Sequence, residues 1–322
     1  MSRPLFLFIF LLLHATFLCS AKDDNKLPIL FTKAEIVNEH TTRIPFKLAD
    51  HLMLIEGSLL DKTGNFIIDT GSENMILNKV HFPELYAHQK KRHSSSGILN
   101  TIDNPHERQI KAFFLNKFRL DDKTSDVIDL SHIETTKKVK ILGIIGYSIL
   151  KDYEVFVDLY LNQITLTKVD RFGTKLASNV YLEKIVDSTS FNLKNHTIVL
   201  SASVNDQNLR MGLDTAAEFN QINRSINRKV LKYFIPTKPL SLVGAGNKEI
   251  EVMAGKLHRL KLSSTLYFGP MYTVLTNLDK MNDAFGTDLD GILGYEFFRQ
   301  KRTIINYKKE KLYFIEYPLE RL

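Results

Sequence analysis

Two short stretches decide the fold: Asn65–Ser72, which reads NFIIDTGS, and Leu209–Ala217, which reads LRMGLDTAA. In each stretch, apolar residues lead directly into an Asp-Thr pair followed by a small residue. A short apolar run bounded by turn residues is typical of a buried β-strand. A carboxylate that follows such a strand costs free energy if it is buried alone. The recurrence of the pattern therefore predicts that Asp69 and Asp214 lie together.

A second pair of matching segments lies downstream. Gly143–Asp158 reads GIIGYSILKDYEVFVD and Gly291–Asn306 reads GILGYEFFRQKRTIIN, and the two align without a gap. The interval between the aspartate and this segment is nearly the same in both halves. Two elements that recur in the same order at the same spacing indicate a tandem duplication. Asp158 and Asn306, at equivalent ends, are expected to be strand residues that face solvent or a turn.

The pattern between these motifs is β in both halves. His51–Leu60 and Thr197–Val204 predict strands that form hairpins with the strands leading to the two aspartates. Polar and small residues replace this pattern near position 170. We therefore expect an N-terminal lobe of residues 22–170 and a C-terminal lobe of residues 171–322.

The first 21 residues predict a secretory signal. Arg3 precedes an apolar run, and small residues lead up to Ala21, after which we expect cleavage. The protein is then exported, to the periplasm, the medium or the cell surface. Cys19 is the only cysteine, so the mature chain has no thiol nucleophile or disulfide. An alternative is that Cys19 carries a lipid anchor. No other apolar run is long enough to cross a bilayer.

Charge and histidine spacing argue against several classes of function. The chain of 322 residues has a net charge of +7, but its basic residues are scattered. The densest cluster, Lys90–Arg92, has no nucleic-acid-binding motif beside it, and we interpret it as a solvated loop. The ten histidines show no metal-ligating spacing. We therefore expect no nucleic-acid partner, no metal and no cofactor.

The paired carboxylates predict acid–base chemistry. Two carboxylates at close range cannot both be ionised, so they share a proton. Asp69 and Asp214 can then activate a water with one oxygen and polarise a substrate carbonyl with another. We expect the hydroxyls of Thr70 and Thr215 to bond to the backbone of the opposite half and to hold the two turns together.

The residues after each threonine shape the turn. Gly71 in the first half and Ala216 in the second allow the chain to turn tightly beneath the carboxylate. The small side chains of Ser72 and Ala217 leave space there.

The two halves resemble lobes of retropepsin-like aspartic proteases, fused in one chain. Asp69–Ser72 matches the Asp-Thr/Ser-Gly-Ala/Ser turn of that family, and Gly143–Gly146 and Gly291–Gly294 match the apolar-Gly element that passes beneath it. The resemblance covers nearly all of the mature chain. It implies an all-β fold of two homologous lobes with a shared cleft, a polypeptide substrate and no cofactor. It also implies endopeptidase activity by a water activated between Asp69 and Asp214.

Two features depart from the family. Ala216 stands where the family has glycine; alanine adds a methyl group and restricts φ, which harms activity if the position needs a positive φ or if the methyl meets substrate. The candidate flaps contain Gly97 in the first half and Gly244 and Gly246 in the second. Neither flap has the tyrosine that pepsin-like enzymes carry.

Two other functions are open at this point. One is a catalytically inactive exported protein of the same fold that binds peptide or another ligand; Ala216 favours it, and the two retained aspartates argue against it. The other is a structural or adhesive β-protein of an outer envelope, which a lipid on Cys19 would favour.

Overall fold

The computed structural model describes residues 35–317, except 87–94, 97–100, 103–105, 116–117, 178–179, 181–183 and 244–248. The predicted signal segment, Cys19 and the flap glycines Gly97, Gly244 and Gly246 lie outside the described residues. Within the described part of the chain, no helix has the length and apolar character needed to span a membrane.

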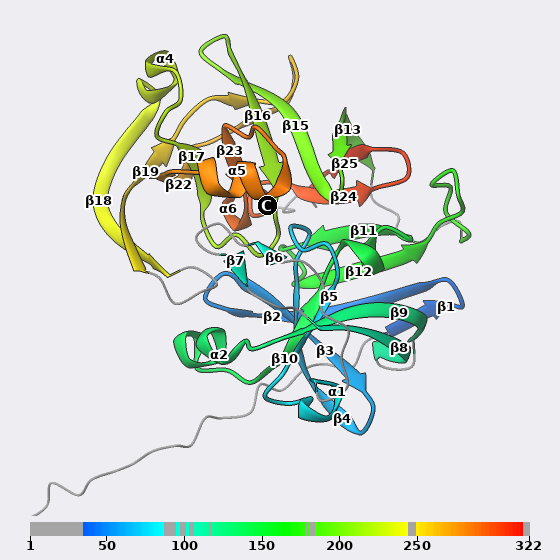
Figure 1. Cartoon of the computed structure of the whole chain (residues 1–322). Helices are drawn as coiled ribbons and strands as arrows, with labels where there is room; N and C mark the ends of the chain where they lie inside the picture. Colours follow the sequence, from blue (N-terminus) through cyan, green and yellow to red (C-terminus); the bar gives the residue numbers. More distant parts are fainter. Residues whose placement is uncertain are drawn as a thin grey trace, which may run out of the picture. The chain divides into compact units, whose positions relative to one another are not determined.

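Most described residues lie in β-strands, so the prediction of an all-β protein is confirmed (Figure 1). The first half contains β1 (Glu35–Asn38), β2 (Thr41–Ala49), β3 (Leu52–Leu59), β4 (Lys62–Ile68), β5 (Met75–Asn78), α1 (Pro83–Tyr86), β6 (Ser95–Ser96), β7 (Thr101–Ile102), β8 (His106–Leu115), β9 (Phe118–Ile128), α2 (Ser131–Lys137), β10 (Ile141–Ile145), α3 (Tyr147–Leu150), β11 (Tyr153–Asp158) and β12 (Gln163–Lys168).

The second half repeats this alternation of strands with short helices. It contains β13 (Ile185–Ser190), β14 (Asn192–Lys194), β15 (Thr197–Val204), β16 (Gln207–Leu213), β17 (Asn220–Asn223), α4 (Arg228–Leu231), β18 (Phe234–Val243), β19 (Glu249–Leu257), β20 (Leu260–Lys261), β21 (Tyr267–Phe268), β22 (Met271–Thr276), α5 (Asp279–Phe285), β23 (Gly291–Leu293), α6 (Tyr295–Phe298), β24 (Arg302–Asn306) and β25 (Lys311–Ile315).

The two halves use the same strand pairing around each aspartate. β10 pairs parallel with β4 and antiparallel with β5, and β5 pairs parallel with β9. In the second half, β23 pairs parallel with β16 and antiparallel with β17, and β17 pairs parallel with β22. The inner strands are apolar throughout: every residue of β10 and of β23 is buried, as expected for strands covered on both faces.

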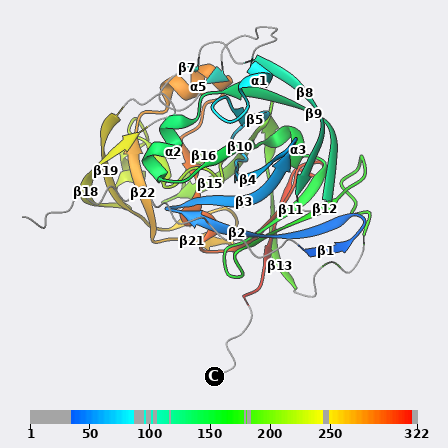
Figure 2. The same ribbon diagram turned by 90° about the horizontal axis from the view of Figure 1, so that it is seen from below.

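One antiparallel pair joins the halves into a continuous sheet. β11 of the first half pairs with β24 of the second, and the strand order there is β13-β25-β24-β11-β12-β2. Figure 2 shows β11 and β12 running beside each other, with β2 and β3 also adjacent. Most of the buried apolar residues of both halves form one core cluster.

This junction corrects one expectation. Asp158 and Asn306 do not face solvent; both are fully buried, because β11 and β24 lie inside the sheet rather than at its rim. Both do face a turn, as the other alternative had it: Asp158 accepts from the Tyr160 amide and Asn306 from the Lys309 amide. Asp158 Oδ2 forms an ion pair with Arg302 Nη2 at 2.7 Å. Asn306 donates to Glu154 Oε2 at 3.0 Å. Polar groups at such depth need partners of this kind.

Candidate active site

Asp69 directly follows β4, and Asp214 directly follows β16. The Asp69 amide donates to the Ile145 carbonyl at 3.0 Å, and the Asp214 amide donates to the Leu293 carbonyl at 2.9 Å. These bonds extend the parallel pairings β4–β10 and β16–β23 by one residue. The backbone of both aspartates is therefore fixed before the turn begins.

Thr70 and Thr215 hold the two turns together, as predicted from the sequence. The Thr70 hydroxyl donates to the Leu213 carbonyl at 3.1 Å, and the Thr215 hydroxyl donates to the Ile68 carbonyl at 2.8 Å. Each hydroxyl also accepts from the other threonine's amide at 3.0 Å. Both side chains are fully buried, so four hydrogen bonds without access to water join the halves directly beneath the aspartates.

Glycines let a second loop pass close to each turn. The amide of Tyr147, after Gly146, donates to the Ser72 carbonyl at 2.8 Å, and the amide of Tyr295, after Gly294, donates to the Ala217 carbonyl at 2.9 Å. A Cβ atom on either glycine would collide with a backbone carbonyl of the turn. The glycines therefore permit the close approach that supports both turns.

The carboxylate of Asp69 is surrounded by donors. Its Oδ1 accepts from the amides of Gly71 at 2.8 Å and Ser72 at 3.1 Å. Its Oδ2 accepts from the Ser72 hydroxyl at 2.6 Å. Such bonds stabilise the ionised carboxylate.

Asp214 has a poorer set of donors. Its Oδ1 accepts from the Ala216 amide at 2.8 Å, and Ala217, at the position of Ser72, has no hydroxyl to offer. Asp214 as a residue is half-buried, but its carboxyl group is closely surrounded by protein atoms. Burial raises the pKa of Asp214 well above its ordinary value, and the charge of Asp69 and a hydrogen bond with its carboxyl raise that pKa further; the amide bonds oppose the rise only in part.

The structure shows why glycine follows the first Asp-Thr pair. Neither Gly71 nor Ala216 has a positive φ; the described glycines that do are Gly173, Gly269 and Gly286. The concern that Ala216 strains its backbone is therefore not supported. Space is the constraint: a Cβ atom on Gly71 would lie 2.8 Å from both Cγ and Oδ2 of Asp214.

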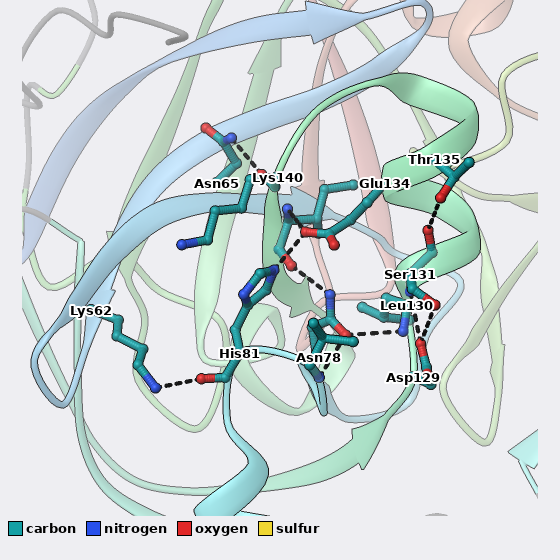
Figure 3. A network of polar contacts seen from close by, with 12 residues as sticks. Lys62, Asn65, Asn78, His81, Asp129, Leu130, Ser131, Glu134, Thr135 and Lys140 are labelled. Carbon is teal, nitrogen blue, oxygen red and sulfur yellow. Dashed lines mark hydrogen bonds and ion pairs between the residues drawn. The ribbon is translucent and has the colours of Figure 1, made fainter. Parts of the chain in front are cut away.

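A polar network anchors the strand that passes beneath the first turn (Figure 3). The buried side chain of Asn78 donates to the Ile141 carbonyl at 2.9 Å and accepts from the Leu130 amide at 3.1 Å. Glu134 accepts from the Ile141 amide and lies 2.6 Å from His81 Nε2. Together these bonds join the residue before α2 and the middle of α2 to the start of β10.

The second half fixes its corresponding strand with a different side chain. Asn282, in α5, donates to the Leu289 carbonyl at 3.1 Å and accepts from the Leu289 amide at 2.9 Å. Glu134 and Asn78 together bond to the backbone of Ile141 in the first half. In the second half, the side-chain amide of Asn282 alone bonds to the backbone of Leu289.

Sequence reasoning missed two histidines that reach across between the halves. His51, just before β3, lies with Nδ1 2.9 Å from the Glu218 carbonyl and stacks on Tyr295 at 4.3 Å. His196, just before β15, faces the turn that carries Asp69. The signal was available, because the two histidines occupy equivalent places in the repeats.

The strands that flank the second flap candidate form a long hairpin. β18 and β19 pair from Phe234 opposite Leu257 to Val243 opposite Glu249, so Gly244 and Gly246 belong to their connection. Gly97 belongs to the connection between the paired strands β6 and β7. The flap function of both segments stays a prediction.

The described residues contain no group of three or more His, Cys, Asp or Glu side chains placed to hold a metal ion. The chain matches no protein-family model. A search of curated proteins likewise finds no match.

Proposed function

We propose that the protein is an aspartic endopeptidase of the retropepsin-like type, with one aspartate from each of two related lobes. The observation that carries the proposal is that the carboxyl of Asp214 lies against the turn of Asp69, beside two threonines that each bond into the opposite turn. Two facing carboxylates repel when both are ionised. Each repeat contributes one carboxylate to the pair, and we infer that the proton shared by the two carboxylates is used in catalysis.

The two turns suggest separate roles. Asp214 keeps the shared proton, because burial and the neighbouring carboxylate raise its pKa. Asp69, held by three donors, acts as the base. It removes a proton from a water molecule, whose oxygen attacks the carbonyl carbon of a peptide bond. Asp214 donates to the carbonyl oxygen as the tetrahedral intermediate forms.

The collapse of this intermediate completes the cleavage. The C–N bond breaks as the amine nitrogen gains a proton, and the products are a new carboxyl end and a new amino end. No covalent link to the protein forms at any stage. The pair as a whole titrates, so the pH profile of cleavage reports two apparent values for the pair.

A second candidate is a binding protein of the same fold without activity. Ala216 favours it. A Cβ atom at Gly71 would press on the Asp214 carboxyl, and Ala216 carries such a Cβ atom at the equivalent place in the other turn. If this methyl keeps water or a substrate carbonyl away from the pair, the site holds a peptide without cleaving it.

The test is cleavage of a peptide library between pH 3 and pH 7 by protein expressed from the full chain. Asp69→Asn and Asp214→Asn keep the shape of each side chain and remove its acid–base function. We expect both variants to lose about 10³-fold or more in kcat/KM. Unchanged circular dichroism and thermal unfolding serve as controls for the fold.

The results separate the candidates. Loss in both variants supports the shared pair, and cleavage that survives in both contradicts it. A parent that is folded but inactive, and that binds peptides, favours the binding protein. The mass of the purified N-terminus tests the proposed export: cleavage after Ala21 supports it, and a lipid on Cys19 favours the envelope protein.

A further inference from the structure

His196 is a buried imidazole without a well-formed hydrogen bond. Only 7% of the residue is exposed, and neither ring nitrogen has a partner in the described structure. Buried polar groups are nearly always paired, so an imidazole with two unpaired nitrogens calls for an explanation. Burial lowers the pKa of His196, which means that the ring is neutral at neutral pH.

The polar groups that act on the charge of this ring are acceptors. Phe285 from α5 lies edge-on to the imidazole at 5.4 Å. Across the junction lies the first aspartate turn: the charges of Glu73 and Asp69 and the carbonyl of Gly71 favour the protonated ring and oppose the effect of burial. A neutral imidazole has one donor and one acceptor, whereas an imidazolium has two donors. Acceptors alone can satisfy both nitrogens only in the protonated form.

The equivalent contact between the halves, beside the turn of Asp214, contains a lysine. There, Lys137 at the end of α2 bridges Glu218 Oε1 at 2.6 Å and Asp50 Oδ2 at 2.8 Å. The end of α5 has Phe285 in place of this lysine. Glu73 therefore has no lysine to match the one at Glu218, and the described residues give its carboxylate no ion pair. Among the described residues, the imidazole of His196 lies close enough to Glu73 for the two charges to interact, and it can become a cation.

We propose that His196 is a positioning residue for the first aspartate turn: as an imidazolium it donates to the Gly71 carbonyl and the Glu73 carboxylate, and it holds the turn of Asp69 against the second half. The catalytic meaning of this contact rests on the proposed function. The contact itself does not.

The contact forms on acidification. Above the pKa of His196 the ring is neutral, and the Asp69 side of the junction lacks the ionic link that Lys137 gives the Asp214 side. Below it, both sides are linked. One junction thus has a lysine between its carboxylates, and the other depends on the protonation of His196 within the acid range in which a carboxyl pair holds one proton.

The first test uses NMR of the isotopically labelled protein and needs no activity. The His196 ring signal is followed from pH 8 to pH 4 in the parent, in Glu73→Gln and in the matched control Glu218→Gln. We expect His196 to titrate below pH 6.5, to titrate at still lower pH in Glu73→Gln, and to be unchanged in Glu218→Gln. A ring that stays neutral while the fold persists, or a midpoint unaffected by Glu73→Gln, overturns the proposal.

The second test measures cleavage. Glu73→Gln and His196→Gln are each expected to lose about threefold to tenfold in kcat/KM at pH 4, as an acceptor or donor of the contact disappears. Neither should lose activity at pH 6.5, and His51→Gln, the matched control, should not show this dependence on pH. An equal loss at both pH values means a merely structural role and overturns the positioning role. If the parent cleaves nothing, the proposed function fails, while the NMR titration still decides whether the contact exists.

Discussion

The two aspartate turns share one backbone frame and differ in the side chains around their carboxylates. In both turns, the threonine bonds into the opposite turn and a glycine-containing loop packs beside it, with equivalent hydrogen bonds. In the first turn, the Ser72 hydroxyl donates a hydrogen bond to the Asp69 carboxylate. Ala217, at the equivalent position of the second turn, has no hydroxyl to donate to Asp214. The comparison teaches that shared residues set the position of the carboxylates, and that differing residues set which carboxylate keeps the proton.

The largest effect should come from the shared frame. Thr70→Val and Thr215→Val each leave a buried amide and a buried carbonyl of the opposite turn without a partner. We expect each change to lower the free energy of unfolding by about 2–4 kcal/mol, measured by urea denaturation. The double variant should lose less than the sum, since the two side chains form one network.

A buried threonine within one half provides the control. Within the described part of the chain, the Thr273 hydroxyl donates to the nearby Met271 carbonyl, so Thr273→Val should cost about 1 kcal/mol. If Thr70→Val and Thr215→Val lower the free energy of unfolding by no more than Thr273→Val does, the threonine bonds between the halves do not stabilise the shared backbone frame.

The next effect concerns the hydroxyl that distinguishes the turns. Ser72→Ala makes the first turn resemble the second and removes a 2.6 Å bond to Asp69. Bonds to a charged group contribute about 1.5–3 kcal/mol, and we expect a loss of this size at pH 7 in urea denaturation.

The reverse change sharpens the comparison. Ala217→Ser offers Asp214 the missing hydroxyl and should make the two carboxyls more alike. A larger effect of Ala217→Ser than of Ser72→Ala would show that the hydroxyl is not what separates the turns.

The positions of the two aspartates and the threonine bonds between the halves could be predicted from the sequence. The other contacts between the halves could not. Asp69, Thr70 and their counterparts lie in short stretches that recur in both halves, so a local pattern placed them. Ser72 was recognised only as a small residue, because its hydroxyl matters through a hydrogen bond that spacing does not reveal. For Asp158 the sequence left solvent and a turn open, and only its burial was missed, since this depends on the pairing of β11 with β24, far apart in the chain.

The pH dependence of stability tests which carboxyl keeps the proton. The folded-state pKa of Asp214 is raised, so the folded protein binds an extra proton above the unfolded pKa, and stability falls as pH rises through this window. Asn does not titrate. Asp214→Asn should therefore gain stability relative to the parent between pH 4 and pH 7, by about 1–2 kcal/mol.

Asp129 gives a control of opposite sign. Hydrogen bonds from the side chain and amide of Ser131 lower the pKa of Asp129, so its contribution is present at neutral pH and is lost as pH falls. Asp129→Asn should therefore lose stability relative to the parent at pH 7 more than at pH 4. Parallel pH profiles for the two variants would contradict the protonation assigned to Asp214.

The smallest effect on stability belongs to Ala216→Gly, yet it decides how far the second turn has diverged. Glycine loses more entropy on folding than alanine, so we expect a cost of about 0.5–1 kcal/mol. Removing the methyl makes the turn match the first one, where a Cβ atom would crowd the opposite carboxyl. Cleavage should therefore rise in Ala216→Gly and fall in Gly71→Ala, measured as kcat/KM on one peptide. If Ala216→Gly leaves cleavage unchanged while Gly71→Ala abolishes it, only the first turn needs the space. The difference between the two turns is then compatible with full activity and is no sign that activity has been lost.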